Sequence, residues 1–102
     1  MRKADVPTSI NEVFSRIMET GRFKNQDEMI NELQMARSYF FKVRKKEHYL
    51  SDENARKLAE LAELPIDYVL AMNNFERCKD EEAREAYKDI FLLIRHLRTK
   101  NQ

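Results

Sequence analysis

The residues best suited to chemistry in this chain are cations and aromatics gathered between positions 36 and 46. No carboxylate interrupts this segment before Glu47, and Ser38, Tyr39 and Phe41 stand among the cations. The cations are Arg37, Lys42, Arg44, Lys45 and Lys46. Guanidinium and ammonium groups bind anions, so the pattern suits the phosphates and base edges of a nucleic acid. A solvated charged surface is the alternative for such a run of charge.

The sequence lacks the patterns that support catalysis or metal binding. His48 and His96 fall in different predicted helices, Cys78 has no neighbouring histidine, and neither a CxxC nor an HxxxH spacing occurs. The only glycine, Gly21, leaves no glycine-rich phosphate loop. The many carboxylates stand at helical spacing beside Lys and Arg, as surface ion pairs do. We therefore expect no enzyme activity, no cofactor and no metal site.

Composition favours a single helical domain. The 102 residues suffice for one domain with its own core. With only one glycine and two prolines, the segments between the connecting loops favour helix. The single Cys78 has no partner for a disulfide within the chain, which is typical of a reducing compartment. No signal-peptide run and no stretch of about 20 apolar residues is present. These features predict a cytoplasmic protein that does not bind membranes.

Charge is distributed unevenly although the net charge is only +1. Residues 22–50 carry seven Lys or Arg against four Asp or Glu, whereas residues 51–91 carry six against eleven. The last eleven residues add Arg95, Arg98 and Lys100 without an acid. A chain that is basic around one helix indicates a surface that faces a polyanion.

Capping residues and hydrophobic spacing predict six helices and no strands. Four residues suited to cap a helix are Ser9, Asn25, Ser51 and Asp80. Gly21 suits the end of the first helix, and Pro65 suits the first turn of the fifth. The predicted ranges are 10–20, 26–33, 36–47, 52–62, 65 to a frayed end near 77–79, and 81–98, after a flexible lead-in at 1–8.

The last predicted helix has an apolar stripe too broad to assign to one partner. Its acidic start and basic end complement the helix dipole. The stripe consists of Ala83, Tyr87, Ile90, Phe91, Ile94 and Leu97, widened by Leu92 and Leu93. Packing on the core is the default for this stripe, and pairing with a second copy of the chain is close behind, so a homodimer is also expected. The candidate interface residues are Tyr39, Tyr87, Phe91 and Ile94.

Residues 10 to 70 resemble the lambda-repressor-like (Cro/C1-type) helix-turn-helix family. The likeness rests on Gln26 at the start of the second helix, Met29 and Leu33 in its core, Met35 in the turn, Phe40 and Val43 on the inner side of the third helix, and the run LSDENARKLAELAELPIDYVL. The segment FERCKDEEAREAYKDI is similar to an extension of small phage-encoded regulators.

Four positions depart from the pattern of that family. Ile30 replaces a small residue, which predicts a wider separation of the second and third helices. Gln34 replaces the turn glycine and would have to adopt a left-handed backbone. Ala36 stands where Ser or Thr would cap the third helix. Lys46 replaces the glycine that follows this helix, which predicts a third helix one turn longer.

The resemblance implies an all-α fold of five helices with a long C-terminal helix added. The implied organisation is a lead at 1–8, a DNA-binding domain at 9–78 and a packing or dimerisation helix at 79–102. The implied function is a sequence-specific transcriptional regulator, such as a phage or mobile-element repressor, that binds double-stranded DNA. A homodimer of this kind reads two half-sites about 34 Å apart.

The resemblance also assigns roles to residues. The recognition helix, residues 36–46, would enter the major groove. The base-contact candidates are Arg37, Ser38, Phe41 and Lys42. The phosphate-contact candidates are Lys24, Gln26, Lys45 and Lys46.

A second hypothesis is a helix-turn-helix fold repurposed to bind and inhibit a host protein. Tyr39, Phe41, Ile30 and the missing turn glycine motivate it, because exposed aromatics mark protein interfaces. The two aromatics also suit burial or contact with DNA bases. The exposure of Phe41 discriminates: a buried ring with Arg37 and Lys42 outward favours DNA, whereas an exposed apolar patch favours a protein partner.

Overall fold

Six α-helices make up the regular secondary structure of residues 6–99, the part of the chain that this computed structural model describes. They are α1 (Ile10–Glu19), α2 (Gln26–Glu32), α3 (Arg37–Arg44), α4 (Asp52–Ala62), α5 (Ile66–Arg77) and α6 (Glu81–Thr99). No strand occurs among these residues, and α6 is the longest helix. The predicted all-α class with a long C-terminal helix is confirmed.

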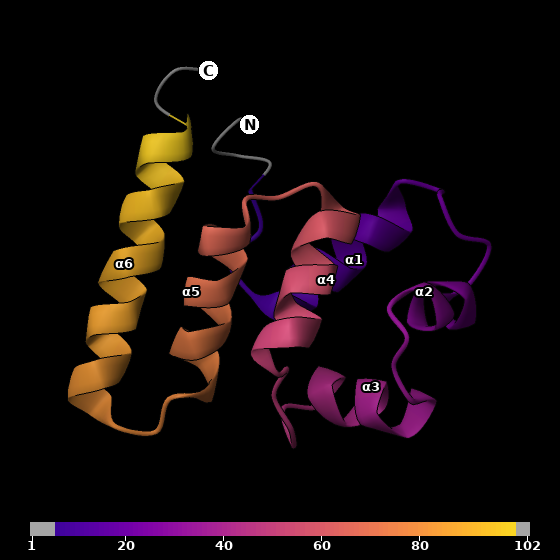
Figure 1. Ribbon diagram of the computed structural model, residues 1–102, viewed down its shortest axis with the longest axis horizontal. Helices are drawn as coiled ribbons and strands as arrows, with labels where there is room; N and C mark the ends of the chain where they lie inside the picture. The colour runs from indigo at the N-terminus through magenta and orange to yellow at the C-terminus, as the bar shows by residue number, and fades with distance from the viewer. Residues whose placement is uncertain (1–5, 100–102) are drawn as a thin grey trace.

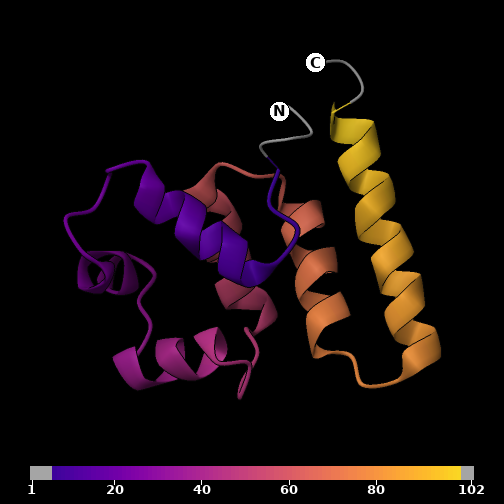
Figure 2. The same ribbon diagram turned by 180° about the vertical axis from the view of Figure 1, so that it is seen from behind.

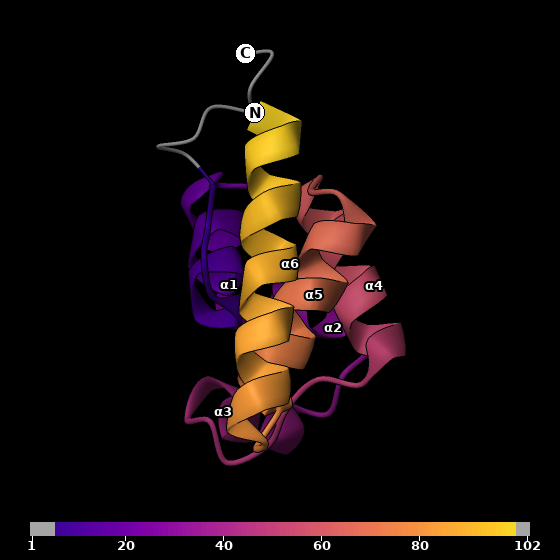
Figure 3. The ribbon, with the colours of Figure 1, turned by 90° about the vertical axis from the view of Figure 1, so that its left-hand side faces the viewer.

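The helices form a slab that measures 34 × 34 × 19 Å (Figure 1). The helices α1, α4 and α5 occupy its middle, and α6 packs antiparallel to α5 along one edge. The pair α2 and α3 lies toward the opposite edge, as the view from behind also shows (Figure 2). The start of α6 and the whole of α3 lie at the same end of the slab in every view (Figure 3). Figures 1 and 2 show α6 along the edge beyond α5 and apart from α3, although the lower end of α6 overlaps α3 in the view of Figure 3.

Aromatic side chains join the helices into one core. The rings of Phe14 and Phe40 meet edge to face with centroids 4.9 Å apart, which ties α1 to α3. Phe91 of α6 lies 6.0 Å from Tyr68 and 5.3 Å from Phe75, both on α5. Such aromatic pairs add about 0.5–1.5 kcal/mol each beyond the burial of their area. The inner face of α6 thus belongs to the same core as α1 and α3.

The segment before α1 is anchored to that core where the structure describes it. Val6 and Pro7 are buried, and the Tyr68 hydroxyl donates a 2.7 Å hydrogen bond to the Pro7 carbonyl oxygen. Burial raises the pKa of Tyr68 to about 12, so the hydroxyl stays a donor. Most of the expected lead-in at 1–8 lies outside the described residues, as does Lys100.

The helix starts lie where local capping chemistry predicts them. Side-chain oxygens of the four predicted caps accept backbone N–H groups three residues later, at 2.9–3.1 Å. The pairs are Ser9 with Glu12, Asn25 with Glu28, Ser51 with Asn54, and Asp80 with Ala83. Each bond satisfies an N–H group that has no partner inside the helix.

The end of α3 departs from the sequence-based expectation. The helix ends at Arg44 rather than running to residue 47, and Lys46 adopts a left-handed φ of 63°. The prediction of a longer third helix was wrong, because the chain must turn here to bury Leu50, whose carbonyl oxygen accepts a 2.8 Å bond from the buried Asn73 amide. The expectation that Gln34 is left-handed is confirmed, with φ 58°.

Candidate nucleic-acid interface

The helix α3 separates its apolar and polar residues onto two faces. Phe40 and Val43 are buried against the core, whereas Ser38, Lys42 and Lys45 are exposed. At 100° per residue the three exposed positions fall within about 60° of one another, on the side of the helix opposite the buried pair. The face that turns away from the core is therefore polar and cationic, which is the arrangement that a groove-binding helix requires.

Arg37 is held against both α2 and its own helix. Its Nε donates to Asp27 Oδ1 at 3.0 Å, and its guanidinium carbon lies 5.0 Å from the centroid of the Phe41 ring. Both partners of this ion pair are largely exposed, so it contributes at most about 1 kcal/mol. Asp27 accepts its hydrogen bond from Nε. The other two nitrogens of the guanidinium group, Nη1 and Nη2, are the ones that form paired hydrogen bonds with guanine. Nothing in the sequence singled out Asp27 as the residue that orients this arginine.

The aromatic residues of α3 are engaged inside the protein. Phe41 is half-buried, and its ring meets Phe40 edge to face at 5.3 Å. Tyr39 is half-buried as well, and its hydroxyl donates to the Tyr49 carbonyl oxygen at 2.7 Å. Ile30 is buried in the core. These three residues form no exposed apolar patch beside α3.

The phosphate-contact candidates come from two elements of the fold. Lys24 and Gln26 stand at the start of α2, and Lys45 and Lys46 follow α3 directly. The three lysines are exposed, while Gln26 is half-buried. The Arg37–Asp27 pair joins the start of α3 to the start of α2. Lys45 and Lys46 lie beyond the other end of α3, about 12 Å along the helix, and Lys46 lies close to Glu76.

Arg44 has a structural role that its residue type concealed. Its Nη1 donates to the Asn11 carbonyl oxygen at 2.9 Å, and Asn11 Nδ2 donates to the Arg44 carbonyl oxygen at 3.1 Å. The guanidinium carbon also lies 5.7 Å from the Phe14 ring centroid. Arg44 thus fastens α3 to α1, and its charge is directed to the protein rather than to a ligand.

A half-buried carboxylate of α5 contacts the start of α1. Glu76 of α5 accepts a 2.7 Å hydrogen bond from the backbone N–H of Ile10, the first residue of α1. Burial raises the pKa of Glu76 above its ordinary value of 4.5, and the bond from Ile10 and the positive charges of Lys46 and Arg84 lower it in part. No local sequence signal marks this contact, because 66 residues separate its partners.

The candidate interface residues of α6 divide between core and surface. Phe91 is 4% exposed and packs on Tyr68 and Phe75, so it lies inside the folded chain. Tyr87 and Ile94 are half-buried. The aliphatic residues that α6 exposes are instead Ile90, Leu92, Leu93 and Leu97.

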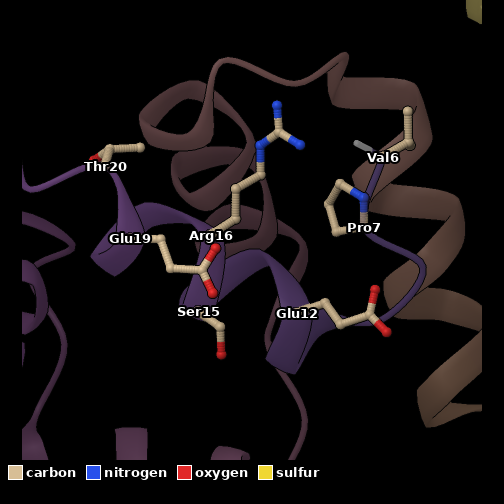
Figure 4. Close-up of a pocket in the computed structure, with 7 residues that line it drawn as sticks. All are labelled: Val6, Pro7, Glu12, Ser15, Arg16, Glu19 and Thr20. Atoms are coloured by element: carbon tan, nitrogen blue, oxygen red, sulfur yellow. The ribbon is translucent and has the colours of Figure 1, made fainter. Parts of the chain in front are cut away.

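One hollow on the surface lies beside α1. A groove of about 530 Å³ lies between the segment before α1 and α1 itself, lined by Val6, Pro7, Glu12, Ser15, Arg16, Glu19 and Thr20. Its polar side chains project in different directions (Figure 4). Over the range 6–99, no group of three or more His, Cys, Asp and Glu side chains is placed to hold a metal ion. Among the described helices, none combines the length and the apolar character needed to cross a membrane.

Comparison with known proteins identifies no family. No family model matches the chain, and no match is found among curated proteins or among solved structures. Over the described residues, the chain is a small all-helical domain of six helices.

Proposed function

We propose that this protein binds double-stranded DNA through α3, as a sequence-specific transcriptional regulator of the phage or mobile-element type. The observation that carries the proposal is the outward face of α3. It presents Arg37, Ser38 and Lys42 on a helix whose other side is held in the core by Phe40 and Val43, and the exposed Lys45 follows directly. The resemblance to the lambda-repressor-like family supports the same assignment. A DNA ligand also implies that the protein works inside the cell.

The geometry around α3 suits a groove rather than a flat surface. The major groove of B-DNA is about 12 Å wide and admits one helix. Lys24 precedes α2, while Lys45 and Lys46 follow α3, so exposed cations precede and follow the helix pair in the sequence. Cations at such positions bind the phosphates on the two edges of a groove and supply affinity without reading sequence.

Arg37 is the residue proposed to read sequence. Its ion pair with Asp27 occupies Nε, and its stacking on Phe41 limits the directions in which the guanidinium can point. An arginine held in this way loses less conformational entropy when Nη1 and Nη2 bind O6 and N7 of guanine. Phe41 then acts as a support for Arg37 as well as a candidate contact for a thymine methyl group.

Fluorescence anisotropy with labelled duplexes tests the proposal. Promoter fragments and a random-sequence pool are titrated with the protein at several salt concentrations. We expect affinity to fall steeply with salt, since each phosphate contact releases a counterion. Absence of salt-sensitive binding to any duplex at low ionic strength would refute the proposal.

Two variants separate the proposed roles. Arg37→Ala should weaken the preferred sequence by about 1–3 kcal/mol and relax the preference, because it removes a base contact. Lys45→Ala should weaken all duplexes alike and reduce the salt slope by about 1. Lys88→Ala is the matched control, since Lys88 is an exposed cation on α6, away from α3. Equal behaviour of Arg37→Ala and Lys45→Ala would contradict the assignment of roles.

The alternative, inhibition of a host protein through the same surface, has less support. It requires apolar residues exposed beside α3, whereas Phe41 and Tyr39 are half-buried and Ile30 is buried. Capture of a host protein that survives high salt and is lost on replacement of Tyr39 by Ala would favour it over DNA binding.

A further inference from the structure

Asp27 lies beside Arg37 at the start of α3, which is the end of a groove-binding helix that contacts the bases. One carboxylate oxygen of Asp27, Oδ1, accepts the bond from Arg37 Nε at 3.0 Å. Within residues 6–99 the other oxygen, Oδ2, accepts no hydrogen bond, and the Asp27 side chain is 61% exposed. The carboxylate therefore holds the arginine with one oxygen and keeps the other open to a ligand.

A carboxylate and an arginine bind different atoms of the bases in the major groove. Arginine Nη1 and Nη2 donate to O6 and N7 of guanine, whereas a carboxylate oxygen accepts from an exocyclic amine, such as N4 of cytosine or N6 of adenine. Guanine and thymine present only acceptors in the major groove, apart from the thymine methyl group. An open carboxylate oxygen therefore distinguishes cytosine and adenine from guanine and thymine.

We propose that Asp27 is a second specificity-determining residue, which requires cytosine or adenine next to the guanine that Arg37 binds. This rests on the proposed function, because it needs α3 in the major groove of a duplex. Oδ1 lies 3.0 Å from Arg37 Nε, and successive bases of one strand are about 3.4 Å apart. A carboxylate at that distance from the guanidinium reaches the neighbouring base, so the two side chains together read a two-base step.

The negative charge of Asp27 strengthens this requirement. Phosphates line both edges of a DNA groove, so a carboxylate inside the groove is repelled by the duplex. An acceptor that loses water without gaining a donor costs free energy as well. Arg37 offsets part of this cost on every duplex, but only a base amine supplies a hydrogen bond to Oδ2. Asp27 therefore lowers the affinity for duplexes that present guanine or thymine at that position.

The fold holds both members of the pair in place. The guanidinium carbon of Arg37 lies 5.0 Å from the centroid of the Phe41 ring, so the ring supports one face of the guanidinium while Asp27 binds its Nε. Phe41 in turn meets the buried Phe40 edge to face. Asp27 belongs to the first turn of α2, where the Asn25 cap accepts a backbone N–H at 3.0 Å. The pair is thus arranged before any DNA is bound.

Selection of duplexes from a random-sequence pool, followed by sequencing, tests the proposal. The natural chain should enrich sites in which cytosine or adenine adjoins the selected guanine. In Asp27→Asn the introduced amide still accepts from Arg37 Nε, so the enrichment of guanine should stay within about threefold. The amide also donates to acceptors such as thymine O4, so the preference for cytosine over thymine at the adjacent position should fall at least about fivefold.

Glu28→Gln is the matched control. Glu28 lies in the same first turn of α2, but its Oε2 accepts the Lys24 N–H at 2.9 Å and makes no hydrogen bond to Arg37. Both variants remove one negative charge, so both should bind unselected duplexes more tightly, by up to about fivefold. Only Asp27→Asn should change the preference at the adjacent position. Far-ultraviolet circular dichroism should show the same helix content for both.

Three results would overturn the role of Asp27, and they differ in what they leave intact. Absence of salt-sensitive binding to any duplex would refute the proposed function and the role of Asp27 with it. A natural chain that binds duplexes but accepts all four bases beside the guanine would leave DNA binding intact and overturn only the role of Asp27. An unchanged preference in Asp27→Asn, or an equal loss in Glu28→Gln, would do the same.

Discussion

The helices α3 and α6 each bury one side and expose the other, but they depend on different interactions. The helix α3 has eight residues, no side-chain N-cap, and left-handed residues, Gln34 and Lys46, beyond its two ends. The helix α6 has 19 residues, a side-chain cap from Asp80 and an acidic first turn. Short isolated helices are unstable in water, so α3 exists because the core holds it. Much of the stability of α6 is encoded in its own sequence.

The exposed sides of the two helices differ in chemistry as well. The outer face of α3 is cationic and lies opposite the buried Phe40 and Val43, whereas the large residues that α6 exposes most, Ile90, Leu93 and Leu97, are aliphatic. A cationic face stays hydrated until a polyanion displaces its counterions, while an aliphatic face gains free energy by leaving water. The exposed sides of α3 and α6 therefore differ in what it costs to keep them in water.

The largest expected effect tests the dependence of α3 on the core. Phe40 is fully buried between Phe14 and Phe41, so Phe40→Ala should lower the free energy of unfolding by about 3–5 kcal/mol. Urea unfolding measures this loss, and amide hydrogen exchange should show α3 losing protection before α6 does. Loss of less than about 1 kcal/mol, or equal exchange in both helices, would contradict the comparison.

The missing cap of α3 predicts a gain of about 1 kcal/mol for Ala36→Ser. Ala36 already has the extended backbone of an N-cap, φ −70° and ψ 138°, and offers no acceptor to the N–H of Tyr39 three residues later. Ser51→Ala is the reverse control on α4, because Ser51 Oγ accepts the Asn54 N–H at 3.1 Å, and it should lose a similar amount. Thermal or urea unfolding of both variants checks the pair. An unchanged free energy of unfolding for Ala36→Ser would contradict the inference that the missing cap weakens α3.

The left-handed residue before α3 predicts a smaller gain. Gln34→Gly should raise the free energy of unfolding by about 0.5–1 kcal/mol, because glycine adopts φ 58° without steric cost. The loss of the exposed Lys57–Gln34 hydrogen bond offsets part of this gain. Gly21→Ala is the reverse control, since Gly21 has φ 74° and open space where a methyl group would stand, so only backbone strain opposes it. Urea unfolding of both variants measures the two changes, and destabilisation by both would show that Gln34 is held by its side chain.

The smallest effect is a change in pH dependence at Glu76. Because burial raises its pKa in the folded chain, the folded state binds a proton more tightly than the unfolded one. This carboxyl group therefore lowers stability as pH rises from about 4.5 through the folded-state pKa. Glu76→Gln keeps an acceptor for the Ile10 N–H and removes that decline. We expect the free energy of unfolding of the variant, relative to that of the natural chain, to be higher at about pH 7 than at about pH 4, as measured by urea unfolding. A constant difference would contradict the raised pKa.

Local chemistry made most helix starts predictable from sequence. A cap such as Ser9 or Asp80 and the N–H that it accepts are three residues apart, so the interaction is visible in the order of residues. The inward positions Phe40 and Val43 followed from helical spacing for the same reason. The sequence-based predictions failed where two contacting residues are far apart in the sequence. Arg44 looked like another surface cation until Asn11 and Phe14 were placed beside it.

The sequence by itself determined six helices, their starts and the cationic character of residues 36–46, because these depend on contacts within one or two turns. Only the tertiary structure decided where α3 ends, since burial of Leu50 beside Asn73 requires the chain to turn at Lys46. It also decided which apolar residues of α6 enter the core. The stripe of that helix is wider than one neighbour can cover, and the position of α5 selects Phe91 for the interior while Ile90, Leu93 and Leu97 stay in water.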